Sequence, residues 1–196
     1  LNGAVAVLAA AGLGLPLLDV DLMGRAFPRA DQTTHAVMGG ALTPFAMVEP
    51  GGRVVLVDRA DPTDLERVVR AVMAQTSGWA GCAFATFPAS RLQQAACQGT
   101  LTRALRLGRA HAAADPATIA ADLGGRRLAA GRVLEIARRP SSTFGQAGIA
   151  LVDDHTGAVL RLEAENEYLL AFVDGEPVAS TPDLLCVLNR RTAAPI

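Results

Sequence analysis

The arrangement of the hydrophobic runs changes at the glycine pair Gly124 and Gly125. Before this pair, segments with helical spacing alternate with short strand-like runs. After it, strand-length runs are separated by turn-forming stretches such as "PSSTFG", "DDHTG" and "DGEP", with no helical spacing between them. The change predicts an α/β (α+β) fold, with an α/β subdomain over residues 1–124 and a smaller β-rich subdomain over residues 125–196. A cleft between such parts is a common place for a ligand.

The clearest single element is a helix that begins at Asp61. An aspartate is a favourable N-cap, Pro62 suits the first helical position, and Asp64 places an acid in the first turn. The apolar residues that follow recur at spacings of three and four, which predicts an amphipathic helix: Leu65, Val68, Val69, Val72 and Met73.

The beginning of the chain predicts a helix followed by a short strand. Asn2 is a plausible N-cap for a helix through about Ala11 that is apolar on nearly every side, so we expect it to be buried within the chain or against a partner subunit. "PLLDV" then predicts a buried strand. Since strand side chains alternate, Asp19 and Asp21 would point to the same side where that strand ends.

The remaining segments fit the same division. "PFAMV" and "RVVLVD" predict two strands joined by a tight turn at "EPGG", and "WAGCAFATF" predicts another strand. "SRLQQAAC", the stretch capped by Thr100 and the stretch after Asp115 and Pro116 predict helices. Strands are predicted in "GRVLEIARR", "GIALVDD", "AVLRLEAE", "YLLAFVD" and "DLLCVL".

Composition argues against several classes of partner. The chain has 18 basic and 19 acidic residues, a net charge of −1, so it has no overall basic footprint for nucleic acid or for an anionic membrane surface. Its apolar runs are shorter than a membrane-spanning helix and are interrupted by glycine and proline. Cys82, Cys97 and Cys186 form no framework for disulfides or zinc. We therefore expect a cytoplasmic protein whose partners are neither nucleic acid nor membranes.

The sequence lacks the motifs of several large enzyme classes. It contains no phosphate-binding G-x-x-x-x-G-K-[ST] loop, no G-x-G-x-x-G fingerprint and no G-x-S-x-G elbow. The three histidines are far apart and show no metal-binding spacing. The sequence therefore identifies no cofactor and predicts no metal site with histidine ligands.

Polar side chains concentrate in one stretch, "LPLLDVDLMGRAFPRADQTTH", within an otherwise aliphatic chain. Together with "GTLTRALRLGRA", "ENEYLLA" and "TPDLLCVL", this stretch resembles the S-methyl thiohydantoin desulfurase domain family over almost the whole chain. Residues match the family's motifs in four places: Asp19, Asp21 and Met23 to Pro28; Gly99, Thr100, Ala104, Leu105 and Gly108; Asn166, Glu167 and Leu169; and Thr181 to Leu184.

Two residues depart from the family's pattern. Leu22 stands where the family usually has glycine, and Arg29 stands where it usually has an acid, so a function of that acid does not carry over. Family members are also longer, with a glycine-rich N-terminal segment and further residues at the other end. We therefore expect this chain to be a part of a longer protein.

The resemblance implies chemistry on a hydantoin or a related cyclic amide, such as hydrolytic or lyase-like removal of a methylthio group. Such a reaction needs a base for water and donors for the ring carbonyls. We expect Asp21 or Glu167 to be the base and Arg25 to hold a ring carbonyl or an anionic ring nitrogen. The remaining candidates for substrate binding are Asp19, Thr33, Thr34, His35, Asn166 and Asp183.

Several alternatives remain open at this point. Asp19 and Arg25 could form an ion pair that only holds a turn, and His35 could be a structural histidine. Asp19, Asp21 and Glu167 could bind a divalent cation. The whole protein could be a non-catalytic ligand-binding or accessory subunit of a hydantoin-processing complex, or chiefly an assembly module. The apolar first helix favours a homo-oligomer.

Overall fold

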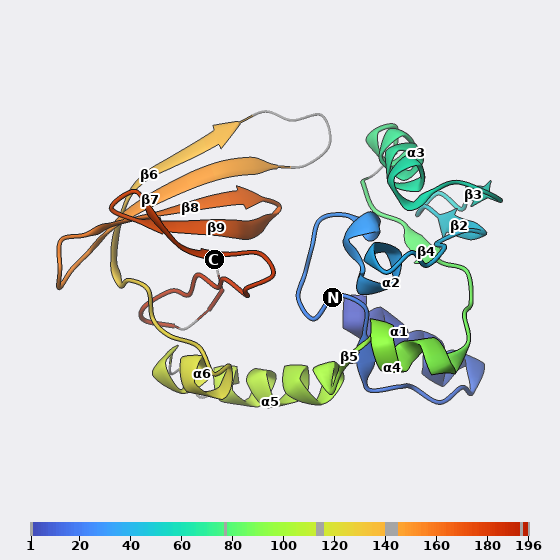
Figure 1. Cartoon of the computed structure of the whole chain (residues 1–196), viewed down its shortest axis with the longest axis horizontal. Helices are drawn as coiled ribbons and strands as arrows, with labels where there is room; N and C mark the ends of the chain where they lie inside the picture. The colour runs from blue at the N-terminus through green and yellow to red at the C-terminus, as the bar shows by residue number, and fades with distance from the viewer. Residues whose placement is uncertain (1, 77, 113–115, 140–144, 193, 196) are drawn as a thin grey trace.

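The computed structural model describes residues 2–76, 78–112, 116–139, 145–192 and 194–195 and has an α+β fold. Figure 1 shows a small sheet with helix α3 (Pro62–Ala74) on one side of the molecule, a larger all-strand sheet on the other, and two helices along the bottom between them. The larger sheet begins at residue 131, as the strand-only pattern after Gly125 predicts. The proposed subdomain boundary near Gly124 stays a prediction.

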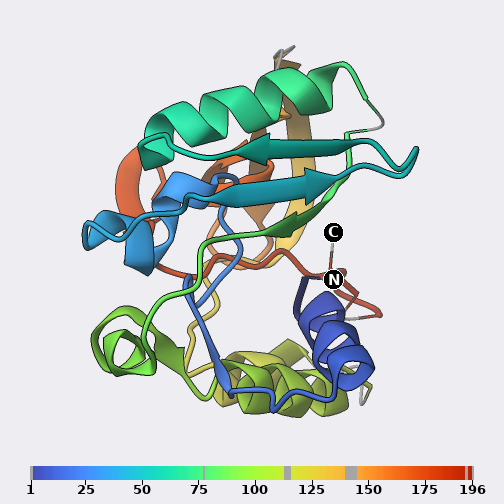
Figure 2. The ribbon, with the colours of Figure 1, turned by 90° about the vertical axis from the view of Figure 1, so that its right-hand side faces the viewer.

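The smaller sheet has three antiparallel strands. Strand β2 (Phe45–Val48) lies between β3 (Val54–Val57) and β4 (Gly81–Ala83), which confirms the hairpin predicted around "EPGG". The strand expected in "WAGCAFATF" is limited to β4. Helix α3 runs alongside these strands (Figure 2), and the core between them is formed by Leu42, Phe45, Met47, Leu65 and Val69.

Helix α3 begins as the sequence predicts. The Asp61 carboxylate accepts a hydrogen bond from the backbone N–H of Asp64 (2.8 Å), and Pro62 is the first helical residue. The apolar spacing places Leu65, which is only 1% exposed, against the sheet, whereas Val68 on the flank is 41% exposed. The helix therefore forms from its own cap and from burial of one face.

Helix α1 (Asn2–Leu13) forms where it was expected but is not buried. Leu8 and Leu13 are 72% and 71% exposed. The sequence of this helix is apolar on every side, so it has no polar face to turn outward and no described part of the chain covers it. The expectation that α1 is buried within this chain is therefore wrong.

The strand predicted in "PLLDV" is also shorter and more exposed than expected. Strand β1 consists of Val20–Asp21 and pairs with β5 (Cys97–Gln98), while residues 15–18 are exposed and belong to no strand. A proline at position 16 removes a backbone donor, which explains why the ladder does not extend toward the N-terminus.

Several short helices precede α5 in the chain. They are η1 (Ala30–Gln32), α2 (Thr34–Val37), η2 (Ala89–Arg91) and α4 (Leu92–Ala95). Helices α5 (Thr100–Ala112) and α6 (Pro116–Asp122) follow, as predicted, whereas Asp115, the expected cap of α6, lies outside the described residues. Within the part of the chain that the structure describes, no helix combines the length and the apolar character needed to cross a bilayer.

The larger sheet is an antiparallel meander in the order β10-β9-β8-β7-β6. Four of its strands were predicted from the sequence, but β10 (Glu176–Ser180) was missed because the turn signals in "DGEP" overlap its first residues. "DLLCVL" was predicted as a strand and forms none, apart from a single bridge at Leu188. The other strands are β6 (Gly131–Arg139), β7 (Gln146–Asp153), β8 (Val159–Glu165) and β9 (Glu167–Val173).

Removing a buried side chain from α3 should destabilise the whole protein. We expect Leu65→Ala to lower the free energy of unfolding by about 3 kcal/mol, since it leaves a cavity between α3 and β2. Val68→Ala, on the exposed flank of the same helix, should cost less than about 1 kcal/mol. Equilibrium unfolding in urea compares them, and equal losses would contradict this account of the core.

The hairpin turn between β2 and β3 should make stability depend on acidity. Glu49 accepts hydrogen bonds from the side chain and backbone of Arg53 and from the N–H of Gly51, and these lower the pKa of its carboxyl from 4.5 to about 2. A carboxyl with a lower pKa in the folded state stabilises the fold above its unfolded pKa, and this contribution is lost as the pH falls through the folded pKa.

We therefore expect Glu49→Gln to flatten the fall in melting temperature between pH 4.5 and pH 2. Glu176→Gln, at an exposed position of β10, is the matched control and should keep the wild-type pH dependence. Thermal unfolding followed by circular dichroism at several pH values measures both. A wild-type slope in Glu49→Gln would assign the acid sensitivity to other carboxyls.

Candidate functional site

Asp19 caps helix α5. Its Oδ1 accepts hydrogen bonds from the backbone N–H groups of Leu101 (2.8 Å) and Thr102 (3.0 Å), and its Oδ2 accepts one from the Thr102 hydroxyl (2.5 Å). The hydroxyl of Thr102 is the largest cause of the lowered pKa of Asp19. Both oxygens are therefore held by the start of α5, and substrate binding by Asp19 stays a prediction.

Asp21 shapes the turn that follows β1. Its Oδ1 accepts hydrogen bonds from the backbone N–H groups of Met23 (2.6 Å) and Gly24 (2.5 Å). Gly24 has a φ of 69° and packs so closely on Cys97 that an added Cβ would lie 3.2 Å from its Sγ. Burial, and secondarily the charge of Asp21, raise the pKa of the Cys97 thiol, which favours the protonated, unreactive form.

Arg25 connects the stretch around β1 with the larger sheet. Its Nη1 donates to the carbonyl of Asp183, and its Nη2 donates to the carbonyl of Tyr168 (2.7 Å) in β9. The guanidinium also lies over the ring of Phe27, 4.9 Å from the centroid. Burial lowers the pKa of Arg25, and the negative charge of Glu167 is the largest opposing influence. The side chain thus joins two segments that are more than a hundred residues away in the sequence.

The turn between β8 and β9 presents the second group of predicted residues. Asn166 has a positive φ of 56°, and its Oδ1 accepts a hydrogen bond from the N–H of Gly145 (3.2 Å). Glu167 is half-buried at the start of β9, and its carboxylate has no hydrogen bond to another described residue. Asp183 accepts a weak hydrogen bond from the N–H of Ser180 (3.4 Å).

Thr33 and Thr34 both make local structural hydrogen bonds. Thr33 is the N-cap of α2, where its hydroxyl donates to the carbonyl of Ala30 (3.0 Å) and accepts from the N–H of Ala36 (3.2 Å). The Thr34 hydroxyl donates to the carbonyls of Leu22 (3.0 Å) and of the last residue of α4. Neither hydroxyl faces away from the protein's own backbone, so their role in substrate binding stays a prediction.

His35 is 3% exposed and packed on both sides. Its ring stacks on Phe87 with a centroid distance of 4.2 Å, and its Nε2 lies 3.2 Å from the carbonyl of Ala41. An added Cβ at Gly40 would come within 2.3 Å of the ring. These contacts agree with the alternative interpretation of His35 as a structural histidine.

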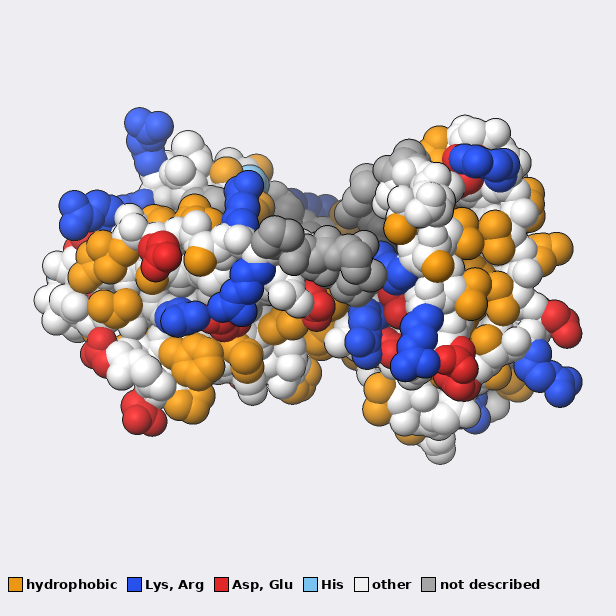
Figure 3. Space-filling view, turned by 90° about the horizontal axis from the view of Figure 1, so that it is seen from above, with side chains coloured by type: hydrophobic (Ala, Val, Ile, Leu, Met, Phe, Trp, Pro, Cys, Tyr) orange, Lys and Arg blue, Asp and Glu red, His pale blue; other side chains and the backbone are white. Residues whose placement is uncertain are grey.

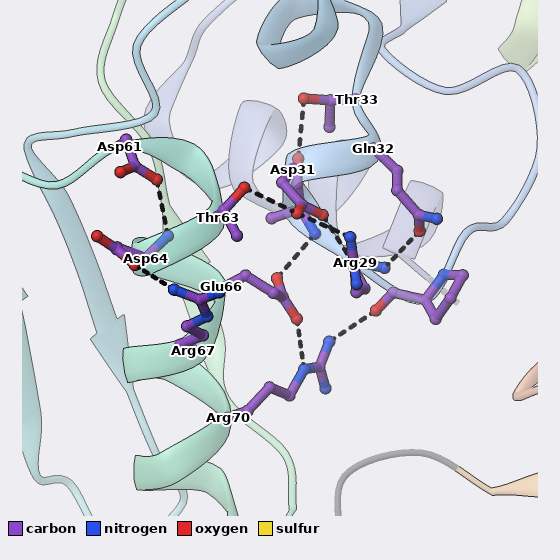
Figure 4. A network of polar contacts seen from close by, with 12 residues as sticks. Arg29, Asp31, Gln32, Thr33, Asp61, Thr63, Asp64, Glu66, Arg67 and Arg70 are labelled. Carbon is purple, nitrogen blue, oxygen red and sulfur yellow. Dashed lines mark hydrogen bonds and ion pairs between the residues drawn. The ribbon is translucent and has the colours of Figure 1, made fainter.

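A buried ion pair on α3 holds the loop between Arg25 and η1. Arg70 donates through Nε to Glu66 (2.5 Å) and through Nη2 to the carbonyl of Pro28 (2.7 Å), while the second oxygen of Glu66 accepts from the N–H of Ala30 (2.8 Å). Figure 4 shows this network, with Arg29 and its neighbours beside it. This network was not predicted from the sequence, although the i, i+4 spacing of an acid and a base on a predicted helix is a signal for it.

The predicted site residues therefore form two groups. Arg25, Glu167 and Asp183 meet where the loop after β1 contacts the larger sheet. Asp19 and Asp21 bind backbone N–H groups near β5 and α5 instead. Among the described residues, no three His, Cys, Asp or Glu side chains are grouped closely enough to hold a metal ion.

The surface has a hollow on both the smaller and the larger sheet. A groove of about 460 Å³ between α3 and strands β2 and β3 contains none of the predicted site residues. A smaller hollow of about 200 Å³ lies on the larger sheet next to the β8–β9 turn, and it is lined in part by Gln146, Glu163, Glu165 and Leu169. The smaller hollow is the one adjacent in sequence to Asn166 and Glu167.

Two family models cover the chain from end to end. The S-Me-THD-like N-terminal domain matches residues 1–59, and the S-Me-THD-like C-terminal domain matches residues 60–196. The protein therefore belongs to the S-Me-THD-like family, which confirms the resemblance seen in its motifs. No curated protein matches the sequence.

A solved structure supports the fold. A protein from Chromobacterium violaceum, determined by a structural genomics consortium, is similar to this chain with a TM-score of 0.72 and 28% sequence identity. The similarity covers 95% of this chain and 52% of that protein. The present chain therefore spans about half the length of this relative.

Arg25 should contribute to stability through its fork of hydrogen bonds. We expect Arg25→Ala to lower the free energy of unfolding by about 2 kcal/mol, because the carbonyls of Tyr168 and Asp183 lose a charged donor. Arg25→Lys should recover little of this lost stability, since an ammonium group lacks the planar fork that reaches both carbonyls.

Arg190→Ala provides the matched control. It removes an exposed ion pair with Asp154 and should cost at most about 1 kcal/mol. Urea unfolding measures the variants side by side. If Arg25→Ala and Arg190→Ala lose the same stability, Arg25 does not hold the loop to the larger sheet.

Proposed function

We propose that the protein binds a small cyclic amide of the hydantoin type at the contact between the loop after β1 and the larger sheet, and hydrolyses its methylthio derivative. The observation that carries this proposal is the half-buried carboxylate of Glu167, which lies near the Arg25 guanidinium without a hydrogen bond to another described residue. A carboxylate in this position can take a proton from a water molecule bound beside it.

The position of these residues supports the same conclusion. The motif around Arg25 and the two motifs around Glu167 and Asp183 come from two distant parts of the sequence and meet at one place. A hollow of about 200 Å³ lies beside the β8–β9 turn, next in sequence to Glu167. Membership of the S-Me-THD-like family supports the choice of a hydantoin-related compound.

The proposed reaction replaces sulfur by oxygen at one ring carbon. Glu167 removes a proton from water as the water oxygen bonds to the C=N carbon that carries the methylthio group. The C–S bond then breaks, the sulfur leaves as methanethiol after taking up a proton, and the ring keeps a carbonyl beside a protonated nitrogen. Arg25 uses three of its five N–H donors on backbone carbonyls, so two remain for a ring carbonyl or an anionic ring nitrogen.

Asp21 is the alternative base. Only its Oδ1 accepts hydrogen bonds from described backbone N–H groups, so Oδ2 remains available to a ligand. Asn166 and Asp183 would then orient the substrate from the sheet. Three unpaired cysteines suit a reducing cytoplasm, which we propose as the location.

A second candidate function is that of a non-catalytic ligand-binding or accessory subunit. The polar groups of Asp19, Thr33 and Thr34 all bind the protein's own backbone, and this favours a structural role for much of the opening stretch. On this alternative, hydantoins bind but are not converted.

The two functions differ in turnover. We would titrate the wild type with hydantoin, 5-oxoproline and 2-methylthiohydantoin by calorimetry, and measure methanethiol release from the last compound with a thiol reagent. Glu167→Gln should keep binding within a few-fold and reduce the rate at least about a hundredfold, as expected for loss of a general base. Asp21→Asn tests the other base, and Glu176→Gln is the control.

Each outcome selects one interpretation. Methanethiol release that depends on Glu167 supports the hydrolase, and release that instead depends on Asp21 transfers the role of base. Binding without release in the wild type favours the accessory subunit. If no hydantoin binds, the proposal fails in both forms.

A further inference from the structure

The two edges of the larger sheet differ in how well they are protected. β10 contains Pro177, which has no N–H to offer, and a register shift between Pro177 and Ala179, and Arg126 donates to the carbonyl of Val178 (3.2 Å). Prolines and irregularities of this kind prevent another strand from pairing with an edge. β10 is therefore a closed edge.

The opposite edge, β6, is open along its second half. A register shift between Val133 and Glu135 interrupts its first half, but from Glu135 to Arg139 it pairs regularly with residues 150 to 146 of β7. No described strand pairs with its other side. In Figure 1 this strand forms the outer border of the sheet, and Figure 3, seen from above, shows arginine and hydrophobic side chains intermixed over this half of the molecule.

The side chains of this segment alternate between the two faces of the sheet. Glu135, Ala137 and Arg139 share one face, and Ile136 and Arg138 share the other. Ile136 is 53% exposed although it is a large apolar residue. The segment thus combines an unpaired backbone, an acid and a base on one face, and an uncovered isoleucine.

We propose that the segment Glu135–Arg139 pairs antiparallel with the same segment of a second copy of this chain, with Ala137 on the twofold axis. In this register Glu135 lies opposite Arg139 of the second copy, and the symmetry repeats that pair. Ile136 lies opposite Arg138 of the second copy, whose methylene groups cover apolar surface while its charge stays in water.

Other registers lack this charge complementarity. Centring the pair on Glu135 places that acid opposite itself and Arg138 opposite Arg132, which brings like charges together. Centring it on Ile136 places Glu135 opposite Ala137 and leaves every charge unpaired. The arrangement of charges therefore selects the register centred on Ala137.

The resulting dimer continues the sheet across both copies. Five paired residues bury little surface, and interfaces under about 1,200 Å² belong to weak, reversible complexes. The dimer should therefore dissociate on dilution.

Cysteine cross-linking tests the register directly. Two Ala137→Cys copies would have opposed Cα atoms about 5 Å apart, within reach of a disulfide. Ile136→Cys is the matched control, because its two copies would be offset by two residues along the strand and separated by about 8 Å. Under mild oxidation we expect a disulfide-linked dimer from Ala137→Cys. We expect no such dimer from Ile136→Cys or from the wild type with its native cysteines.

A charge exchange provides a second test that leaves the thiols unchanged. Glu135→Arg should weaken the dimer roughly tenfold in sedimentation velocity, since two attractive pairs become repulsive. Adding Arg139→Glu restores both pairs with reversed sign and should restore the dissociation constant. Circular dichroism confirms that each variant is folded.

Several results would overturn the proposal. One is that the wild type stays monomeric at every concentration. Another is that Ala137→Cys and Ile136→Cys cross-link equally. The third is that the double charge variant dimerises no better than Glu135→Arg. A disulfide-linked dimer from Glu135→Cys instead of Ala137→Cys would show that another register forms.

Discussion

The buried pair of Glu66 and Arg70 is the contact on which the arrangement of the candidate site depends. One carboxylate and one guanidinium on α3 hold the backbone of Pro28 and Ala30, so the loop after β1 has a fixed path beside α3. Since the carboxylate of Glu66 is buried, loss of Arg70 would leave a buried charge without its partner as well as a free loop. The position of Arg25, at the other end of this loop, follows from that anchoring.

Most of the polar groups that make the opening stretch conspicuous have structural partners. Asp19 completes the first turn of α5, and Thr33 completes the first turn of α2. The groups that remain available to a ligand are fewer and lie mainly on the side of the larger sheet, around Glu167. Much of this motif therefore builds the junction itself.

The sequence predicted the parts of this fold that depend on local patterns. The cap and apolar spacing of α3, the hairpin at "EPGG" and the strand-only region after Gly125 are all properties of neighbouring residues. It could not predict the exposure of α1 or the absence of a strand at "DLLCVL", because both depend on which surfaces meet in space. The same limit applies to the site: the motif around Arg25 was recognisable, but its partners are carbonyls, which every residue carries.

Because Arg25 binds backbone carbonyls, the junction responds differently to substitutions and to changes in chain length. Arg25 recognises the path of the main chain at Tyr168 and Asp183 and makes no bond there to their side chains. Substitutions at those two positions can therefore alter the chemistry of the junction while the clamp itself persists, whereas an insertion or deletion in β9 or after β10 would move the carbonyls out of reach. The junction is therefore tolerant of changes in side-chain composition and intolerant of changes in chain length.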